Sequence, residues 1–408
     1  MKRVVITGMG VVSPIGTNVQ TFYDSLLAAK SGIYKQGFSW GHALVAQVQD
    51  DIDSPFPKIK RLSLDRVTQM ALLAVRQAAD QAQIDFAADN GTTAGIYWGT
   101  GMGGAITLES AYRDLLINQV PRLRPVTIVA AMNNAATGQI GIDFGIRGPS
   151  YTYSSACSSS AVAIGEGFRA IRFGLVRTAI VGGAEALLTE GVFKAWNSLQ
   201  TLAKLDADRP ETSCRPFAAD RSGFVLGEGA AALILEEEES ARERGAAILA
   251  EVIGYGNTTD ASHITQPNAA GQSLAMAQAI AEAALTPEQI HHINAHGTGT
   301  KLGDVSETNA IKQIFGSTAH AIPISATKAL HGHLMGATGA VEFVAVLEAL
   351  RTRTVPPTAH LFHPDVDCDL DYIVEGKRQL AILDVVMSNS FGFGGNNVTL
   401  IARRYPHP

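Results

Sequence analysis

The sequence is poor in cysteine, carries no excess of basic residues and lacks long apolar runs. Its 408 residues include three cysteines, Cys157, Cys214 and Cys368, and no C-x-x-C pair, which argues against a disulfide framework and favours a reducing, cytoplasmic environment. Lysine and arginine total 32 against 38 acidic residues, a net charge of −6, so nucleic acid is not expected as a partner. No run approaches the ~18 apolar residues of a membrane span, so no span is expected.

Glycine is abundant instead, and its placement predicts the fold class. Many of the 40 glycines end short β-prone runs, as in residues 94–101 and 178–183. Such runs alternate with amphipathic stretches such as residues 64–82. This alternation is typical of α/β proteins with parallel or mixed sheets, in which the functional site lies at the strand ends.

The second half of the chain repeats short motifs of the first half in the same order. Trp-Gly-Thr-Gly at 98–101 has a counterpart in Gly-Thr-Gly at 297–299, and Ser-Ala-Cys at 155–157 has one in Ser-Ala-Thr at 325–327. Each echo is short, but their order and type agree with a duplicated α/β unit.

Cys157 occupies a position that favours a reactive thiol. A Gly-Pro-Ser break at 148–150 and a β-prone run at 151–153 precede it, and residues 161–175 carry apolar or small side chains at helical spacing. Cys157 is therefore predicted at or near the N-terminus of a buried helix. Unpaired N–H groups and the helix dipole there favour a thiolate and can hold an oxyanion. The alternative is a buried cysteine acting as a small apolar filler.

Two histidines in loops favour the catalytic interpretation. His296 directly follows a predicted strand and precedes Gly-Thr-Gly-Thr, and His333 directly precedes a predicted helix. With Cys157 they form a Cys/His/His set suited to covalent catalysis. Metal binding is the alternative for these histidines, but no H-x-x-x-H or C-x-x-C spacing supports it, so no metal is expected.

Four motifs, taken together and in order, resemble those of a known family. They are Ser-Ala-Cys-Ser-Ser-Ser at 155–160, Asn-Ala-His-Gly-Thr-Gly-Thr at 294–300, Thr-Lys-Ala-Leu-His-Gly-His at 327–333 and Asn-Ser-Phe-Gly-Phe-Gly-Gly-Asn-Asn at 389–397. From Val4 to its C-terminus the chain resembles an elongating β-ketoacyl-acyl-carrier-protein synthase of the thiolase superfamily. The resemblance implies a thiolase-like five-layer αβαβα fold, built from two duplicated halves with mixed sheets.

The resemblance also implies a division of the chemistry between residues 1–245 and residues 246–408. In the N-terminal half, Cys157 would carry the growing acyl chain as a thioester received from an acyl carrier protein. In the C-terminal half, His296 and His333 would donate hydrogen bonds to the thioester carbonyl of malonyl-carrier-protein and stabilise the enolate formed as carbon dioxide leaves. Both imidazoles should then be neutral, which predicts lowered pKa values.

Further roles follow from the same resemblance by motif position. Backbone N–H groups of Cys157 and Phe393 would form an oxyanion hole for the acyl-Cys carbonyl. Lys328 and Glu342 would orient groups and act electrostatically, with Lys328 as a catalytic base the less favoured alternative. The residues implied in substrate binding and gating are Phe391, Phe393, Trp196, Met102, Thr298 and Thr300.

The chain departs from the family pattern at four of its positions. His331 stands where threonine or another small residue is usual in the fatty-acid enzymes, and Asn396 replaces a usual threonine. Trp196 falls at the gate of the acyl pocket and Met102 near its bottom. A wide aromatic side chain at the gate would shorten the pocket or stack on a flat, conjugated or aryl-primed chain.

No cofactor is expected, because the resemblance implies substrates delivered on the phosphopantetheine arm of an acyl carrier protein. The family acts as dimers, and two possibilities stay open: a self-sufficient homodimeric fatty-acid synthase, or a type II polyketide or aryl-polyene subunit active only with a paralogous partner resembling a chain-length factor.

A thiolase would need a second cysteine near Phe393, an initiating synthase would have asparagine at His333, and a chain-length factor would lack Cys157. A non-catalytic scaffold for carrier protein is the alternative from another class.

Overall fold

A ten-stranded sheet made of two similar runs of five strands forms the frame of the molecule. The computed structural model describes residues 1–86 and 90–406, and the strand order is β11-β10-β14-β15-β9-β1-β8-β6-β4-β5. The first run comprises β1 (Val4–Val12), β8 (Gly229–Glu237), β6 (Thr178–Glu185), β4 (Ala94–Gly99) and β5 (Ser150–Tyr153). The second comprises β9 (Ala250–Thr259), β15 (Asn396–Arg403), β14 (Val385–Gly392), β10 (His292–Asn294) and β11 (Ile324–Ser325).

The two runs have the same pattern of strand directions. Counted outward from the centre, the neighbours pair antiparallel, antiparallel, parallel and parallel in both. The runs meet where residues 4–6 of β1 pair with residues 250–252 of β9. The sheet is therefore mixed and internally duplicated, as the sequence echoes predicted.

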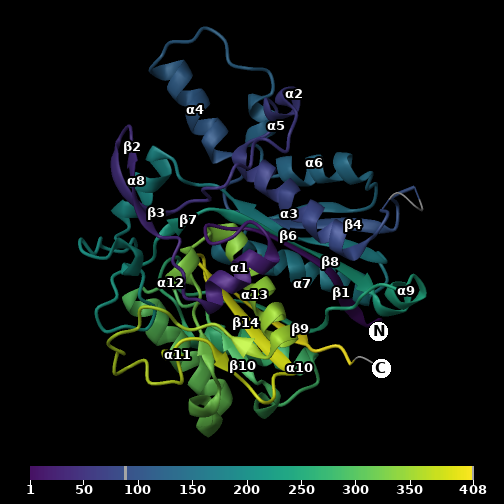
Figure 1. Cartoon of the computed structure of the whole chain (residues 1–408), viewed down its shortest axis with the longest axis vertical. Helices are drawn as coiled ribbons and strands as arrows, with labels where there is room; N and C mark the ends of the chain where they lie inside the picture. The colour runs from purple at the N-terminus through teal and green to yellow at the C-terminus, as the bar shows by residue number, and fades with distance from the viewer. Residues whose placement is uncertain (87–89, 407–408) are drawn as a thin grey trace.

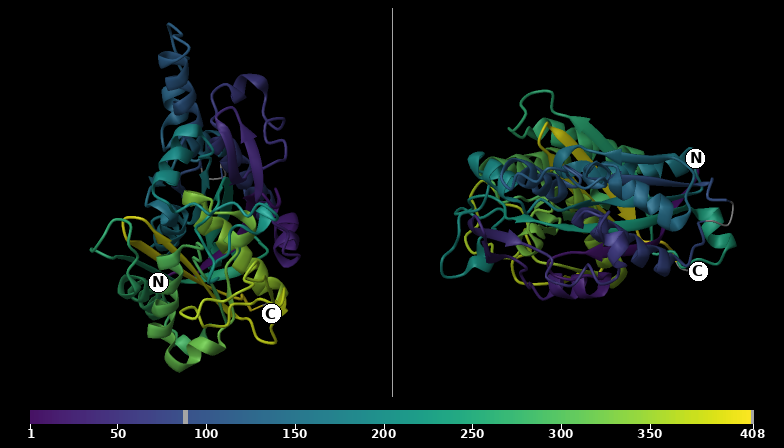
Figure 2. Two further views of the ribbon diagram at one scale, coloured as in Figure 1. Left: turned by 90° about the vertical axis from the view of Figure 1, so that its left-hand side faces the viewer. Right: turned by 90° about the horizontal axis from the view of Figure 1, so that it is seen from above.

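Helices separate the two runs and cover their outer faces, giving five layers (Figures 1 and 2). In the middle, α7 (Ser159–Arg172) and α13 (Thr338–Thr352) share one apolar cluster with strands of both runs. On the outside, α3 (Arg66–Ala82) covers the first run, and α10 (Ala269–Glu282) and α11 (Lys301–Phe315) cover the second. This arrangement confirms the predicted αβαβα fold.

The packing of α3 on β1 depends on two glycines of the strand. A Cβ atom at Gly8 or Gly10 would lie 2.0 Å from the carbonyl oxygen of Ala78 or Ala74 in α3. A helix can approach the strand so closely only where no side chain stands between them. Within α3 the buried residues recur at helical spacing, and the Asp65 carboxylate accepts the N–H of Val67 at the start of the helix.

The remaining elements surround this frame. A projection at the top of Figure 1 contains α4 (Ala105–Leu116) and α5 (Thr127–Ala131), with α6 (Ala135–Phe144) beside it. The others are α1 (Val19–Leu27), β2 (Tyr34–Phe38), β3 (Gly41–Ala46), α2 (Lys58–Arg61), α8 (Glu190–Ser198), β7 (Leu226–Gly227), α9 (Glu238–Glu243), α12 (Lys328–His331), β12 (Thr354–Val355) and β13 (Arg378–Gln379). Among the described residues, no helix has the length and apolar character needed to cross a bilayer.

Candidate active site

Cys157 lies between β5 and the central helix α7, at a sharp turn. Ala156 has a φ of +53°, a left-handed conformation that costs a non-glycine residue about 1 kcal/mol. Residues 156–158 form a single 3₁₀ turn, and α7 begins directly afterwards at Ser159. The side chain of Cys157 is buried at the start of the helix, as predicted.

The resting protonation state of Cys157 differs from the expectation. Burial raises the pKa of the thiol to about 11, although the Lys328 ammonium group and the backbone N–H groups of Phe393 and Cys157 act in the opposite direction. The N–H groups at the helix start favour the thiolate, as predicted, but desolvation of the sulfur outweighs them, so the resting thiol is neutral. An oxyanion hole at this position would use the same two N–H groups.

His333 contacts the cysteine through a defined ring nitrogen. Its Nε2 atom lies 3.0 Å from Sγ of Cys157, while its Nδ1 atom accepts the N–H of Met335 at 3.1 Å and lies 2.9 Å from the hydroxyl of Thr338. A backbone N–H can only donate, so Nδ1 is unprotonated and Nε2 carries the proton. Burial, followed by the charge of Lys328, lowers the pKa of His333 well below its usual value.

His296 is held in the same tautomer by Lys328. The Nζ atom of Lys328 lies 3.3 Å from Nδ1 of His296, donates to the carbonyl oxygen of that residue, and donates to Oε1 of Glu342 at 2.7 Å. An ammonium group only donates, so Nε2 of His296 carries the ring proton. Burial, then Lys328, lowers the pKa of His296 well below its usual value. The predicted neutral imidazoles are thus confirmed for both histidines.

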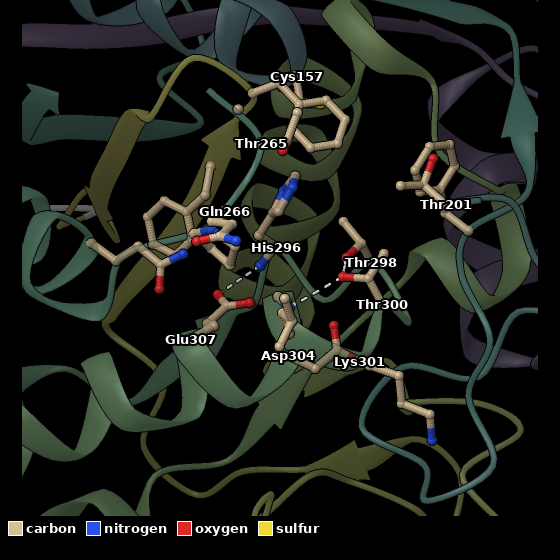
Figure 3. A pocket seen from close by; sticks show the side chains of 18 of the residues that line it. Cys157, Thr201, Thr265, Gln266, His296, Thr298, Thr300, Lys301, Asp304 and Glu307 are labelled. Carbon is tan, nitrogen blue, oxygen red and sulfur yellow. Dashed lines mark hydrogen bonds between the residues drawn. The ribbon is translucent and has the colours of Figure 1, made fainter. Parts of the chain in front are cut away.

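The three side chains converge on one point of the cavity. One side-chain donor atom from each of Cys157, His296 and His333 lies within 4.8 Å of the other two, and the two imidazole rings are nearly perpendicular. Figure 3 shows His296 between Cys157 and Glu307. This spacing is also close enough for a shared metal ion, but the Lys328 charge, which already disfavours a positive imidazole here, would oppose a metal cation too.

Glu307, which lies in none of the four sequence motifs, fixes the loop that carries His296. Its carboxylate accepts the backbone N–H groups of His296 and Gly297, both at 2.8 Å, and the side chain of Asn389 at 3.3 Å. The residue projects from α11 and is buried, which raises its pKa to about 7. Its sequence signal was an acidic residue on the buried face of a helix directly after the His-Gly-Thr-Gly-Thr motif.

Glu185, also outside these motifs, joins the two halves of the site. It lies at the end of β6, and its carboxylate accepts N–H groups of Gly101 at 2.6 Å, of Met102 at 3.2 Å and of Gly336 at 3.0 Å. The first two belong to the loop after β4, and the third follows His333 in the chain. An acidic residue at the end of an otherwise apolar strand was the signal available in the sequence.

A row of aromatic side chains connects Phe393 to His333. Phe393, between Gly392 and the positive-φ Gly394, stacks on Trp196 with ring centroids 5.6 Å apart. Trp196 packs edge-on against Phe224 with ring centroids 5.5 Å apart, and Phe224 packs edge-on against His333 with ring centroids 5.0 Å apart. Phe224 had no distinguishing signal in the sequence, since it lies in an ordinary β-prone run.

The remaining residues predicted to bind substrate differ in how they lie relative to the cavity beside Cys157. Thr298 and Thr300 line the cavity with Cys157, and their hydroxyl oxygens lie 2.9 Å apart. Phe391 is buried and packs against His296, with the two ring centroids 6.0 Å apart. Met102 is half exposed in the loop after β4 and does not line this cavity.

Comparisons with known proteins agree with this geometry along the whole chain. Residues 1–241 match the family model described as beta-ketoacyl synthase, N-terminal domain, and residues 249–362 match beta-ketoacyl synthase, C-terminal domain. The chain is 39% identical over 411 residues to the 3-oxoacyl-[acyl-carrier-protein] synthase 2 of Staphylococcus aureus (strain COL), with 99% of both chains covered. It superposes on the ishigamide ketosynthase/chain length factor with a TM-score of 0.92, 32% identity and coverage of 99% and 100%. It superposes on a type II PKS ketosynthase solved with its acyl-carrier protein, AntDE:AntF, with a TM-score of 0.91, 28% identity and the same coverage.

Proposed function

The chain belongs to the β-ketoacyl synthase family, and we propose that it elongates an acyl chain by decarboxylative Claisen condensation with malonyl-acyl-carrier protein. The observation that carries this proposal is the pair of neutral imidazoles beside a buried cysteine. His296 and His333 each keep a proton on Nε2 because the other ring nitrogen accepts a hydrogen bond, and both rings adjoin Cys157. Two fixed N–H donors are suited to an oxyanion, not to removal of a proton.

The first step transfers an acyl group from its carrier to Cys157. The sulfur attacks the thioester carbonyl, the new C–S bond forms, the bond to the pantetheine sulfur breaks, and the cysteine proton leaves with that sulfur. Because the pKa of the thiol is about 11, its proton must move as the attack occurs. The N–H groups of Cys157 and Phe393 would hold the carbonyl oxygen as it becomes negative.

The second step uses the histidines. The bond between the malonyl carboxylate and its neighbouring carbon breaks, carbon dioxide leaves, and the electron pair forms an enolate whose oxygen accepts the Nε2–H groups of His296 and His333. The enolate carbon then attacks the acyl-Cys carbonyl, a C–C bond forms, and Cys157 leaves as a thiolate that takes up a proton. Each preorganised donor is worth about 3 kcal/mol to such a charge.

The partners of this reaction are an acyl carrier protein and a second ketosynthase-type subunit. β5 is an edge strand of the sheet, and the helices α4 and α5, which reach it through α6, expose large apolar side chains. An unpaired edge beside an apolar surface marks a protein interface. The exposed apolar residues are Leu108, Tyr112, Leu115, Leu116, Ile128 and Val129.

A second candidate function is a polyketide-type subunit that needs a chain-length-factor-like partner. The likeness to the ishigamide ketosynthase/chain length factor, with 32% identity over 99% of the chain, favours it. The 39% identity to a 3-oxoacyl-[acyl-carrier-protein] synthase 2 favours the self-sufficient enzyme. Trp196, stacked at the gate, suits flat conjugated chains and is compatible with either assembly.

Intact-mass spectrometry of the purified chain tests the proposal. The chain is incubated with malonyl-carrier-protein and a panel of saturated and conjugated acyl-carrier-proteins, and both the mass of the enzyme and the product length are followed. Elongation by the chain alone supports the fatty-acid-type function. Elongation only after a paralogous partner is added supports the second candidate. If Cys157 is never acylated under either condition, the proposal fails.

A further inference from the structure

His333 is fixed through its backbone as well as through its ring, because both of its backbone polar groups are bonded to the segment that contains β7. Its N–H donates to the carbonyl oxygen of Val225 at 2.7 Å, and its carbonyl oxygen accepts the N–H of Gly227 at 3.0 Å. Leu226, between these two partners, pairs with His333 as an isolated parallel bridge. The place of the imidazole in the site therefore depends on where β7 lies.

β7 has two residues, so its own place depends on the elements that flank it. On the edge away from His333 it pairs in parallel with β3, where Val45 and Ala46 lie opposite its two residues. The segment of His333 also packs closely on β3, since a Cβ atom at Gly332 would lie 2.7 Å from Cβ of Ala46. β3, β7 and His333 thus form one small hydrogen-bonded unit, and a shift of β7 relative to β3 would move His333.

An ion pair between Arg66 and Glu228 closes the corner where β3 and β7 end. Glu228 directly follows β7 and is fully buried. The guanidinium group of Arg66, at the start of α3, donates to both carboxylate oxygens, most closely at 2.6 Å. Both side chains also hold Val48, two residues beyond β3. The carboxylate accepts its N–H at 3.1 Å, and the guanidinium group donates to its carbonyl oxygen at 2.9 Å.

We propose that Arg66 and Glu228 are a positioning pair for His333, which holds β7 against β3 and so keeps the Nε2–H donor of His333 where enolate formation requires it. An arginine fork and a backbone N–H together need the several acceptor sites of an ionised carboxylate. Neither side chain lines the cavity beside Cys157, so the pair acts through the backbone of His333. The inference rests on the proposed function of the site, since it concerns the decarboxylation step.

The far end of β8 provides a matched control. Glu228 directly precedes this nine-residue strand, and Glu236 lies at its other end. Glu236 is also buried, and Arg244 donates to both of its oxygens, at 2.8 and 2.5 Å. The hydroxyl of Thr7 donates to the same carboxylate at 2.5 Å. Removing either pair should therefore cost similar stability, and only removal of the first pair should change the reaction.

The main variants are Glu228→Gln and its control Glu236→Gln, each of which removes one buried charge and keeps the size of the side chain. Arg66→Met and its control Arg244→Met remove the guanidinium groups. The measurements are kcat and KM for carbon dioxide release from malonyl-N-acetylcysteamine, and the melting temperature. The imidazole nitrogen chemical shifts of His333 and His296 are recorded in histidine-labelled protein, in which His333→Gln assigns the first set.

We expect Glu228→Gln to lower kcat for decarboxylation about tenfold and to leave KM within about twofold, because a displaced imidazole donates less well to the developing charge. The nitrogen shifts of His333 should change, and those of His296 should stay. Glu236→Gln should lower the melting temperature to a similar extent, keep kcat within about twofold and leave both sets of shifts unchanged.

The proposal is overturned if folded Glu228→Gln decarboxylates at the unmodified rate, if KM carries the loss, if Glu236→Gln is equally slow, or if the shifts of His333 stay unchanged. Should Glu228→Gln not fold, Arg66→Met and Arg244→Met decide by the same criteria. Failure of the proposed function is distinguishable, because the unmodified chain would then release no carbon dioxide. The imidazole shifts of the folded variants would still show whether the pair positions His333.

Discussion

The two halves of the molecule share one strand pattern but differ in the segment that leads from the outermost strand to the central helix. In the first half, β5 ends at Tyr153 and α7 begins at Ser159, so the chain needs only the turn that carries Cys157. In the second half, β11 ends at Ser325 and α13 begins at Thr338. The longer segment carries Lys328, His331 and His333.

Under the proposed function, this difference divides one reaction between the two halves of a duplicated unit. The short turn leaves its cysteine at a helix start, where the backbone N–H groups of Cys157 and Phe393 favour a negative charge on the sulfur. The longer segment folds back against that turn, so that His333 lies 3.0 Å from the sulfur. Glu185 of the first half accepts the N–H of Gly336 at 3.0 Å and ties the two segments together. In the proposed reaction, the first half would supply the nucleophile and the second the donors.

The largest expected effects come from removing Cys157 from the first half or His296 from the second half. Cys157→Ala should abolish acylation and condensation while decarboxylation of a malonyl thioester persists, because the histidine donors remain. His296→Ala should retain acylation and lose roughly 10²–10³-fold in decarboxylation. Mass spectrometry and carbon dioxide release measure the two steps separately, with Cys214→Ala as the control for cysteine removal. Loss of both activities in both variants would contradict the division.

Titration of Cys157 shows whether burial or the local dipoles dominate the pKa of its thiol. Because burial raises its pKa to about 11, the thiol is neutral at pH 7–9 and the thiolate fraction grows as the pH rises toward 11. The rate of iodoacetamide alkylation at Cys157 should then rise about tenfold per pH unit between pH 7 and 10. Peptide mapping identifies the labelled site, and Cys157→Ala gives the background from the other cysteines. A plateau below pH 8 would show that the dipoles prevail.

The contact between the halves at the gate predicts a change in substrate preference. Trp196 of the first half stacks on Phe393 of the second. Trp196→Phe should loosen the stack on Phe393, which lines the cavity, and shift the preference from flat or short acyl chains toward longer saturated ones by about threefold to tenfold, the effect of a small change in apolar contact. Competition between acyl-carrier-proteins, with product length read by mass spectrometry, measures the shift. An unchanged preference for chain length and primer would show that Trp196 does not control which acyl chains enter.

The smallest expected effect compares two equivalent alanines. Ala156 precedes Cys157 with a φ of +53°, whereas Ala326, its counterpart before Thr327, is buried and is not among the positive-φ residues of the described chain. Ala156→Gly should leave the free energy of unfolding nearly unchanged, since relief of strain offsets the entropy that glycine loses on folding. Ala326→Gly should destabilise by about 1 kcal/mol. Urea denaturation measures both, and equal losses would show that the turn at Ala156 is unstrained.

The sequence by itself determined the features that depend on local order. The β-prone run before Cys157 and the apolar spacing after it placed the thiol at a helix start, and the glycine-ended runs placed His296 beyond a strand. The repeated motifs also predicted two similar halves, because a duplicated chain keeps its strand-turn-helix order. These features follow from neighbouring residues, so periodicity and turn chemistry suffice to predict them.

Only the tertiary structure decided the properties that arise between distant segments. The raised pKa of Cys157 comes from burial beneath both halves, which no local dipole reveals. The roles of Glu185, Glu307 and Phe224 depend on contacts with residues that are distant in the sequence. The tautomers of His296 and His333 likewise depend on which donor each ring nitrogen meets across the fold. Desolvation and hydrogen-bond direction are set by the complete packing, and a linear sequence does not contain them.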